Sequence, residues 1–385
     1  MSYLERLLEG VEMDWKVLGD ESFFEIANSG RKPVKASERT PGKIPYYGAN
    51  NIQDYVEGYT HNGEYILIAE DGTQSLENYS IQWVTGKFWA NNHVHVIRGK
   101  KFINNRFVFH YLKTVNFVPF LSGGGRAKLT KGKLVELQIP IPPLEIQEEI
   151  VRILDTFTEL TAELTAELTA RKQQYEYYRE ELLSFEEGEA EYLPMGDKRL
   201  GKFIRGSGLQ KKDFTESGVG CIHYGQIHTY YGTHANKTLS FVSEEFAKKA
   251  RMAEYGDLII ATTSEDDEDV CKAVAWLGEE KIAISSDACF YRHNLDPKYV
   301  AYYFQTNQFQ KQKMRFITGA KVRRVNADNL AKIKIPVPSL EEQQRIVSIL
   351  DKFDTLTNSI SEGLPKEIEL RNKQYEYYRD LLLTF

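Results

Sequence analysis

The chain has 385 residues, enough for two or three domains, and a formal net charge of −6 at neutral pH. It contains no run of 18 apolar residues and no signal-peptide pattern, which argues against a membrane protein and predicts a cytoplasmic one without a membrane partner. The three cysteines form no CxxC or Cys/His spacing, which argues against a disulfide scaffold and a zinc site.

The negative charge is unevenly distributed. Residues 1–143 carry 17 Lys/Arg against 15 Asp/Glu, and residues 192–339 carry 22 against 17. Residues 144–191 carry only 4 against 14, and residues 340–385 carry 6 against 9. The excess acid therefore lies in two segments. The remainder is mildly basic, which permits a surface that faces nucleic-acid phosphates.

Residues 1–143 have the pattern of a mixed α/β domain. GEYILIAEDGT from Gly63 is an apolar run that leads into a polar turn, as expected of a β-strand that delivers a loop. FVFHYLKT from Phe107 predicts an aromatic amphipathic helix, and LSGGGRAKLT from Leu121 predicts a flexible basic loop. LQIPIPPLE from Leu137 predicts a strand that ends at prolines, followed by the start of a helix.

A long helix is predicted over residues 144–188. From Leu144 to Phe185 the sequence has no Pro or Gly and is rich in good helix formers. Its apolar residues recur mostly every three, four or seven positions, which is the spacing of an amphipathic helix. Roughly 40 residues at about 1.5 Å each make a rod of about 60 Å. Because such a rod cannot bury its apolar stripe alone, we expect a partner helix in the same chain.

The second half of the chain repeats the first. IPIPPLEIQEEIVRILDTF from Ile139 matches IPVPSLEEQQRIVSILDKF from Ile335, and QYEYYR occurs at both Gln174 and Gln374. Between these segments the frame matches but most residues differ. A constant frame with variable loops is typical of two related modules that recognise different targets.

The repeat predicts an α+β fold, with two pseudo-symmetric mixed α/β domains separated by two long antiparallel coiled-coil helices. The predicted segments are a first domain at 1–143, a first long helix at 144–188, a second domain at 189–339 and a second long helix at 340–385. Gly363 and Pro365 should kink or interrupt the second helix.

The sequence contains no motif for catalysis, cofactor binding or metal binding that we can defend. GGGR at Gly123 is not followed by Lys-Ser/Thr in P-loop spacing, so a flexible loop is the better interpretation. His93 and His95 have no carboxylate or Cys partners at ligand spacing, and the acidic run from Glu265 to Asp269 fits a solvated turn. We therefore predict no catalytic residue, no cofactor and no metal in this chain.

Side chains suited to nucleic-acid contact occur at matched positions in the two halves. Lys and Arg in the two basic loops can neutralise phosphates, and amide and aromatic side chains can read base edges. The candidate DNA-binding residues are Tyr46, Tyr47, Asn50, Asn51, Arg126, Lys128, His223, Tyr224, Gln226, Lys321, Arg323 and Arg324. The alternative for each is a structural role, and it is strongest for Tyr47 and Tyr224, which precede a shared Gly.

The chain resembles the specificity subunit of a type I restriction-modification system over nearly its whole length. The resemblance is carried by WKVLGD at Trp15 and YLPMGD at Tyr192, the two IPxP exits, the TAEL ladder at Thr161 to Leu168 and the two QYEYYR segments. It implies two target recognition domains, each reading one half of a bipartite, asymmetric site in double-stranded DNA. It also implies that the paired helices set the half-site spacing and dock two modification (methyltransferase) subunits.

The same resemblance implies a division of labour between subunits. Restriction (endonuclease and translocase) subunits would join the complex for cleavage. S-adenosylmethionine, ATP and Mg would be held by the partner subunits. The chain itself would be the non-catalytic specificity subunit of a DNA adenine methyltransferase and type I restriction endonuclease.

Two other functions remain open from the sequence. The first is a coiled-coil protein-interaction scaffold without sequence-specific DNA binding, which would lack the steep salt dependence that phosphate neutralisation produces. The second is a single-strand or RNA-binding module, suggested only by the aromatic content of 12%. Competition between duplex and single-stranded DNA distinguishes it from a duplex reader.

Overall fold

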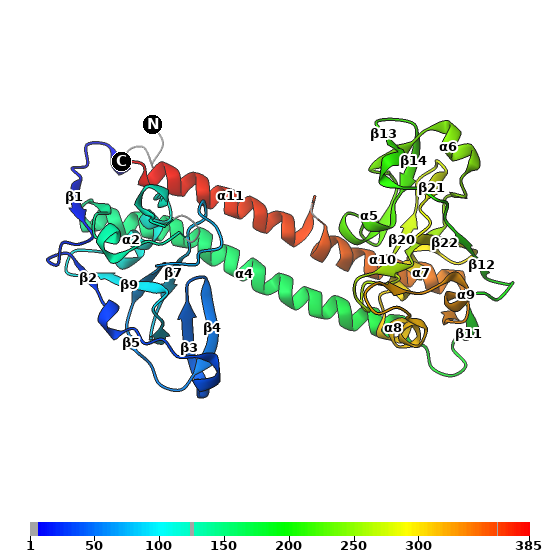
Figure 1. The fold of residues 1–385 in the computed structure, drawn as a ribbon, viewed down its shortest axis with the longest axis horizontal. Helices are drawn as coiled ribbons and strands as arrows, with labels where there is room; N and C mark the ends of the chain where they lie inside the picture. The colour runs from blue at the N-terminus through cyan, green and yellow to red at the C-terminus, as the bar shows by residue number, and fades with distance from the viewer. Residues whose placement is uncertain (1–6, 124–126, 360) are drawn as a thin grey trace. The chain divides into compact units, whose positions relative to one another are not determined.

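The computed structural model describes residues 7–123, 127–359 and 361–385, which fall into two compact units (Figure 1). Unit 1 comprises Met1–Thr165 and Glu367–Phe385, and unit 2 comprises Ala166–Lys366. The predicted boundaries at 143/144 and 339/340 lie immediately before helices α4 and α10. The compact units divide the chain differently, because each includes parts of the long helices that follow both repeats.

Unit 1 contains two four-stranded sheets and one strand pair. The sheet orders are β2-β9-β6-β7 and β4-β3-β8-β5, and β1 pairs with β10. The strands are β1 (Asp14–Val17), β2 (Phe24–Ile26), β3 (Pro41–Gly48), β4 (Asn51–Val56), β5 (His61–Asn62), β6 (Tyr65–Ala69), β7 (Ile81–Val84), β8 (Lys87–Ala90), β9 (Val94–Gly99) and β10 (Gln138–Ile141). From β1 to α4, the helices of the described residues are η1 (Asn28–Gly30), η2 (Ala36–Glu38), α2 (Asn105–Leu112), η3 (Val118–Phe120) and α3 (Lys131–Leu134).

Unit 2 contains two five-stranded sheets, β12-β22-β18-β20-β15 and β13-β16-β14-β21-β17, and the strand pairs β11-β24 and β19-β23. The strands are β11 (Glu191–Pro194), β12 (Gly201–Arg205), β13 (Phe214–Thr215), β14 (Val219–Ile222), β15 (His234–Ala235), β16 (Ser240–Val242), β17 (Met252–Ala253), β18 (Leu258–Ala261), β19 (Thr263–Ser264), β20 (Ala273–Trp276), β21 (Ile282–Ile284), β22 (Ala288–His293), β23 (Arg323–Arg324) and β24 (Lys334–Val337). The shorter helices are η4 (Lys211–Asp213), α5 (Tyr224–Thr229), α6 (Glu244–Lys249), α7 (Pro297–Tyr303), α8 (Asn307–Lys313), η5 (Met314–Phe316) and α9 (Ala327–Leu330).

The central strands form where the apolar runs predict them. Every residue of β6 and of β18 is buried, which explains why these strands read as continuous apolar runs rather than as alternating ones. Strand β6 leads directly into Glu70, and β18 leads into Thr262. Each strand therefore delivers a polar loop from a rigid sheet, as the sequence predicts.

The duplicated segments at the start and end of each repeat pair with one another. Strand β1 pairs antiparallel with β10, with Trp15 opposite Pro140, and β11 pairs with β24, with Tyr192 opposite Pro336. Proline lacks a backbone N–H, and a two-stranded ladder tolerates it because one side of each strand has no partner strand. The two repeats thus close in the same register.

The long helices behave differently in the two repeats. Helix α4 (Leu144–Leu182) is continuous over 39 residues, whereas the second segment forms α10 (Leu340–Asn358) and α11 (Gly363–Leu383). Gly363 has a φ of +77°, in the left-handed region, and Pro365 lies in the first turn of α11, where a missing N–H is tolerated. The predicted interruption at Gly363 and Pro365 is confirmed.

Each unit joins the beginning of one long helix to the end of the other. In unit 1, Leu154 of α4 shares a core with Leu382 of α11, and the rings of Phe157 and Tyr378 stack at 5.1 Å. In unit 2, the rings of Tyr178 from α4 and Phe353 from α10 stack at 5.5 Å. Contact between the start of one helix and the end of another is expected of helices that run antiparallel. The stripe of α4 therefore packs against helices of the same chain near its two ends, whereas Leu160 between them is exposed.

Candidate nucleic-acid interface

In unit 1, three loops at one end of the sheets are tied together by amide side chains. Asn50, in the turn between β3 and β4, donates from Nδ2 to the Gly72 carbonyl at 2.7 Å and accepts at Oδ1 from the Gln74 backbone N–H at 3.0 Å. The buried Asn91 donates to Gln53 Oε1 at 3.4 Å. Loops that are far apart in sequence thus form one surface.

This surface, which we call the amide face, presents five exposed amide side chains. They are Asn50, Asn51, Gln53, Gln74 and Asn92. Asn and Gln can donate to and accept from the major-groove edge of adenine in a bidentate manner, although the Asn50 amide already bonds to the Gly72 and Gln74 backbones. Asn50 and Asn51 were predicted from sequence. Gln53, Gln74 and Asn92 were not, and only the folded chain brings the loops of Gln74 and Asn92 beside the β3–β4 hairpin that carries Asn50 and Gln53.

A charge network fixes the loop that follows β6. Glu70 accepts from Arg31 at 2.6 Å and pairs with Lys128 at 2.9 Å, and His93 lies 2.6 Å from Asp71. Partial burial opposes ionisation of Glu70, but the hydrogen bonds from Arg31 and Lys128 outweigh it and lower the pKa of Glu70. The predicted contact Lys128 therefore lies in an ion pair at the edge of the loop.

The predicted role of Tyr46 in DNA contact requires correction. Its side chain is only 1% exposed, and its hydroxyl lies within hydrogen-bonding distance of the Val34 backbone N–H, at 3.0 Å. The pairing of β3 with β4 has a bulge between Tyr46 and Tyr47, and the two side chains differ in burial: Tyr46 is buried, whereas Tyr47 is half-buried and packs edge-on to Phe88. Tyr46 therefore holds the 34–46 segment together and has no surface to offer a base.

Arg126, also predicted to bind DNA, lies outside the described residues. Its counterparts in unit 2 lie in the segment that includes β23. Lys321 and Arg324 are exposed, whereas Arg323 pairs with Asp267 at 2.9 Å and donates to the Gly319 carbonyl at 2.7 Å. For the exposed Lys321 and Arg324, contact with phosphate stays a prediction.

The basic segment of unit 2 rests on the acidic loop that follows β19. Strands β19 and β23 pair, with Thr263 opposite Arg324. The buried Lys313 donates from Nζ to the carbonyl oxygens of Glu268 and Val270, both at 2.9 Å. Unit 1 shows the same pairing of a basic loop with the loop after the central strand, through Lys128 and Glu70. The two halves therefore place their basic loops in equivalent positions.

His223 and Gln226 cap helix α5 rather than projecting as a pair. Gln226 Oε1 accepts from the His223 backbone N–H at 2.9 Å, and His223 Nδ1 accepts from the Gly225 N–H at 3.3 Å. Burial, assisted by Lys211, lowers the pKa of His223, so the imidazole is neutral at pH 7. Tyr224 is half-buried against the sheet. A role of these three residues in base reading stays a prediction.

The histidines and acidic residues set aside in the sequence have local protein partners. His95 is fully buried, with Nε2 at 2.7 Å from the Leu129 carbonyl. Asp266 Oδ1 accepts from the backbone N–H groups of Glu268 and Asp269. Within the described part of the chain, no group of three or more His, Cys, Asp or Glu side chains is arranged to hold a metal ion. None of the helices there is long and apolar enough to cross a bilayer.

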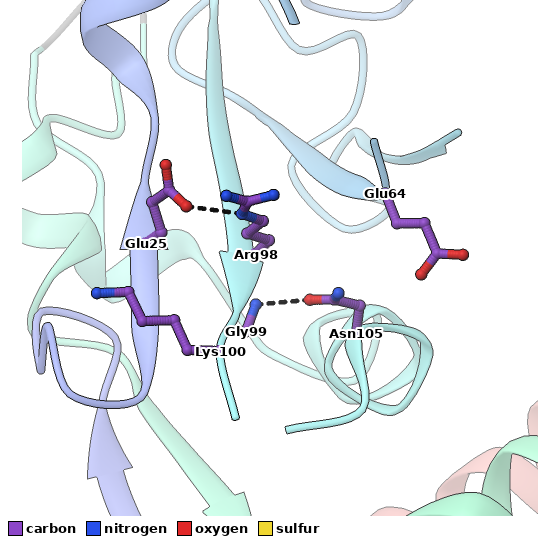
Figure 2. A pocket seen from close by; sticks show the side chains of 6 residues that line it. All are labelled: Glu25, Glu64, Arg98, Gly99, Lys100 and Asn105. Carbon is purple, nitrogen blue, oxygen red and sulfur yellow. Dashed lines mark hydrogen bonds and ion pairs between the residues drawn. The ribbon is translucent and has the colours of Figure 1, made fainter. Parts of the chain in front are cut away.

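A pocket of about 530 Å³ in unit 1 is lined by polar groups that mostly bond within the protein. Figure 2 shows Glu25 turned toward Arg98, at 2.6 Å, and Asn105 Oδ1 accepting from the Gly99 N–H at 2.5 Å. Lys100 donates to the Glu21 carbonyl. Because these bonds occupy its main polar groups, the pocket has no convergent set of groups for a ligand.

Comparison with known proteins identifies the class of molecule that these features serve. The family model of the type I restriction modification DNA specificity domain matches residues 12–171 and 200–370. The chain therefore belongs to the type I restriction-modification DNA specificity family. Each match covers one α/β module and an adjoining stretch of long helix, so the two modules are target recognition domains.

Relatives and solved structures agree with this assignment. A putative type I restriction enzyme specificity subunit of Haemophilus influenzae is 48% identical, and the match covers all of this chain and 98% of the relative. The EcoR124I/EcoR124II specificity subunit of Escherichia coli is 35% identical, with 100% and 97% covered. The crystal structure of the type I restriction-modification S subunit from M. genitalium has the same fold, with a TM-score of 0.60 at 16% identity and 99% of both chains covered.

Family membership confirms the α+β fold with two recognition domains and the function of DNA target recognition. It decides against a scaffold without sequence-specific DNA binding. A specificity subunit is the non-catalytic member of its restriction-modification system, which is the function that the sequence predicts for this chain.

Proposed function

We propose that this specificity protein reads a bipartite site in double-stranded DNA, with unit 1 recognising one half-site and unit 2 the other. The observation that carries the proposal is the duplication itself: one chain contains two family matches, each built on the same strand pair, central strand and long helix. Two similar readers in one chain suit two half-sites, because a dimeric reader binds DNA in the same way.

The loops of the two units support different modes of contact. The amide face of unit 1 offers groups that read adenine edges, and Lys321 and Arg324 of unit 2 offer cations that neutralise phosphates. We expect the recognised DNA to be modified on adenine by partner methyltransferase subunits that hold S-adenosylmethionine. ATP and Mg would belong to the partner subunits, with restriction subunits acting in cleavage, and the complex would assemble in the cytoplasm.

A module exchange tests the assignment of half-sites. Residues 15–138 would be replaced by the equivalent segment of a relative with a different target, and the methylated motif of the host genome would be mapped. We expect one half-site to change and the other to stay. The matched control exchanges residues 191–337 and should change only the other half-site. An unchanged motif in both exchanges contradicts the proposal.

The long helices are proposed to set the distance between the half-sites. Deleting one four-residue TAEL repeat from α4 removes about 6 Å of helix. We expect the spacer of the methylated motif to change by one or two base pairs, because B-DNA rises about 3.4 Å per base pair. Altered half-sites with an unaltered spacer contradict this part of the proposal.

Two equivalent tyrosines support docking of two copies of one partner. Tyr177 of unit 2 and Tyr377 of unit 1 come from the two QYEYYR segments and are 62% and 64% exposed. Large exposed aromatic side chains are enriched at protein interfaces. We expect Tyr177→Ala or Tyr377→Ala to reduce the stoichiometry from two modification subunits to one, measured by native mass spectrometry. Tyr255→Ala, at a side chain that is 65% exposed on unit 2 outside the long helices, is the control.

A further inference from the structure

In each recognition domain one short helix, α2 in unit 1 and α7 in unit 2, bonds to a long helix. In both units the N-cap of this helix is followed six residues later by a ring that reaches an aspartate of the long helix. The rings are His110 after Asn104 and Tyr302 after Asp296. The aspartates are Asp155 in α4 and Asp351 in α10, which occupy matched positions in ILDTF and ILDKF.

In unit 1 the contact is a chain of hydrogen bonds that joins three residues through a buried histidine. His110 is fully buried, with Nε2 2.8 Å from Asp155 Oδ1 and Nδ1 2.9 Å from the Tyr375 hydroxyl of α11. Arg106 also donates to Asp155 Oδ1, at 2.7 Å. The His110 and Arg106 hydrogen bonds lower the pKa of Asp155 against the opposing effect of burial, so the carboxylate only accepts. Neutral His110 therefore donates from Nε2 and accepts the Tyr375 O–H at Nδ1.

In unit 2 different donors satisfy the equivalent carboxylate. The Tyr302 hydroxyl donates to Asp351 Oδ1 at 2.7 Å, and Lys298 Nζ lies 2.8 Å from Asp351 Oδ2. Lys298 corresponds to Arg106, because each is the second residue after its N-cap. The aspartate and the pattern of two donors are thus retained, although both donors differ.

A second attachment lies two turns earlier on each long helix. Gln147 Oε1 accepts from the Asn104 N–H at 2.8 Å, and its Nε2 donates to the Pro142 carbonyl at 2.8 Å. Gln343 bonds in the same way to the Asp296 N–H, at 2.9 Å, and to the Pro338 carbonyl, at 2.9 Å. Glutamine and aspartate are eight residues apart, about 12 Å along a helix. One contact leaves a domain free to pivot on the helix, whereas two contacts fix its angle.

The short helix packs against the central strand that leads into the candidate reading loop, so its orientation affects the position of that loop. In unit 1, Phe107 of α2 packs in one core with Ile66 and Ile68 of β6, and β6 runs straight into Glu70 of the loop network. In unit 2, Val300 of α7 shares a core with Ile260 of β18, which leads to the 262–269 loop. Because close-packed cores transmit displacement, a tilt at the aspartate moves the loops.

We propose that Asp155 with His110, and Asp351 with Tyr302, are positioning residues that fix the angle at which each domain presents its loops to DNA. We call these two pairs the pins. This inference rests on the proposed function, in which each unit reads its own half-site. His110 and Tyr302 are fully buried, so we expect the pins to act on discrimination of the half-site read by their own unit and not through a contact with DNA.

The test uses the assembled specificity–modification complex. Methylation rates are measured on the cognate duplex and on duplexes with one mismatch in either half-site, after the exchange experiment has assigned half-sites to units. For Asp155→Ala we expect discrimination in the unit 1 half-site to fall by about tenfold, comparable to the effect of one mismatched base pair. Discrimination in the other half-site should be unchanged. Asp351→Ala should give the converse.

Three further variants separate positioning from general stability. His110→Gln keeps a donor and an acceptor and should retain discrimination, whereas His110→Leu should lose it in the unit 1 half-site alone. If the alanine variants do not assemble, Tyr302→Phe provides the same test for unit 2. It removes one hydroxyl and should cause a smaller loss of discrimination in the unit 2 half-site. Equal losses in both half-sites, or unchanged discrimination in an assembled complex, overturn the inference. A failed exchange experiment instead overturns the proposed function.

Discussion

The two units solve one attachment problem with different chemistry. Unit 1 satisfies Asp155 with an imidazole and a guanidinium, and unit 2 satisfies Asp351 with a phenol and an ammonium. Any two N–H or O–H donors can satisfy the aspartate, provided that each reaches the carboxylate. The comparison teaches that the acceptor on the long helix is retained between the repeats, whereas the donors on the recognition domain are free to change with the domain.

The candidate reading surfaces differ more than the attachments do. Unit 1 presents neutral amides, whereas unit 2 presents cations beside an acidic loop whose Asp267 pairs with Arg323. The backbone frame beneath them is shared, since both basic loops lie against the loop that follows the central strand. Differences in specificity can therefore accumulate in side chains without rebuilding the sheets.

The largest expected effect comes from the matched core leucines of the long helices. Leu154 and Leu350 are both fully buried, the first in the core of unit 1 and the second in that of unit 2. We expect Leu154→Ala and Leu350→Ala each to lower the free energy of unfolding by about 2–5 kcal/mol. Hydrogen exchange should rise mainly in the unit that carries the cavity. Equal exchange increases in both units would show that the units do not open separately.

The second attachment predicts a smaller and unequal effect. Gln147 makes one more bond than Gln343, from Nε2 to the Phe102 carbonyl at 3.2 Å. Replacing either glutamine by alanine strands buried backbone groups and should reduce stability by about 1–3 kcal/mol, more for Gln147. Urea unfolding of each variant and of the wild type measures this loss of stability. The exposed neighbours Glu148 and Gln344 are the alanine controls, and their variants should differ little from wild type.

Much of this frame is predictable from the sequence because it depends on period and repetition. The apolar run from Gly63 becomes β6, the helix formers from Leu144 become α4, and Gly363 separates α10 from α11. Gln147 and Asp155 also left a signal, since both recur in the second repeat as polar residues within helices that are otherwise apolar on that face. Period and repetition specify which elements form and which of their residues recur.

The parts that could not be predicted depend on which residues meet in space. Nothing in YYG says which of two adjacent tyrosines faces the core, and the structure buries Tyr46. FVFHYLKT and YVAYYFQT differ at His110 and Tyr302, so alignment of the repeats hides their common partner. The amide face draws on three separate loops, and Gln53 and Gln74 come together only through tertiary hydrogen bonds.

The difference between the reading surfaces predicts different responses to salt. Removing the two exposed cations by Lys321→Ala and Arg324→Ala should weaken binding to all sequences alike. It should also reduce the slope of log K against log salt by about 0.9 per lost phosphate contact. Gln53→Ala with Gln74→Ala should leave the slope unchanged and relax base preference in one half-site. Fluorescence anisotropy on cognate and mismatched duplexes between low and physiological salt separates the two, and identical responses would refute the distinction.

The smallest expected effect is a difference in pH dependence between the two pins. Burial lowers the pKa of His110 below its ordinary value of 6.5, aided by Arg106 and Lys113 and opposed by Asp155. The neutral imidazole is therefore favoured in the folded state. Its stabilising contribution is present above pH 6.5 and is lost as the pH falls toward the lowered pKa, with a slope of at most about 1.4 kcal/mol per pH unit for one proton. Tyr302 does not titrate in this range, because burial raises its pKa.

Burial also lowers the pKa of His95, so the stability of this histidine environment changes with pH in the same direction. The contribution of His110 must therefore be measured as a difference between variants. Urea unfolding of wild type and of His110→Gln at pH 7.5 and 5.5 gives it, and the wild type should lose more stability. Discrimination in the unit 1 half-site should weaken only where the pH falls below the lowered pKa of the folded imidazole, and only in the wild type, since glutamine keeps the bond to Asp155 without titrating. In unit 2 the phenol of Tyr302 should hold discrimination constant at both pH values. Parallel losses in the two half-sites would mean that the imidazole is not what makes unit 1 acid-sensitive.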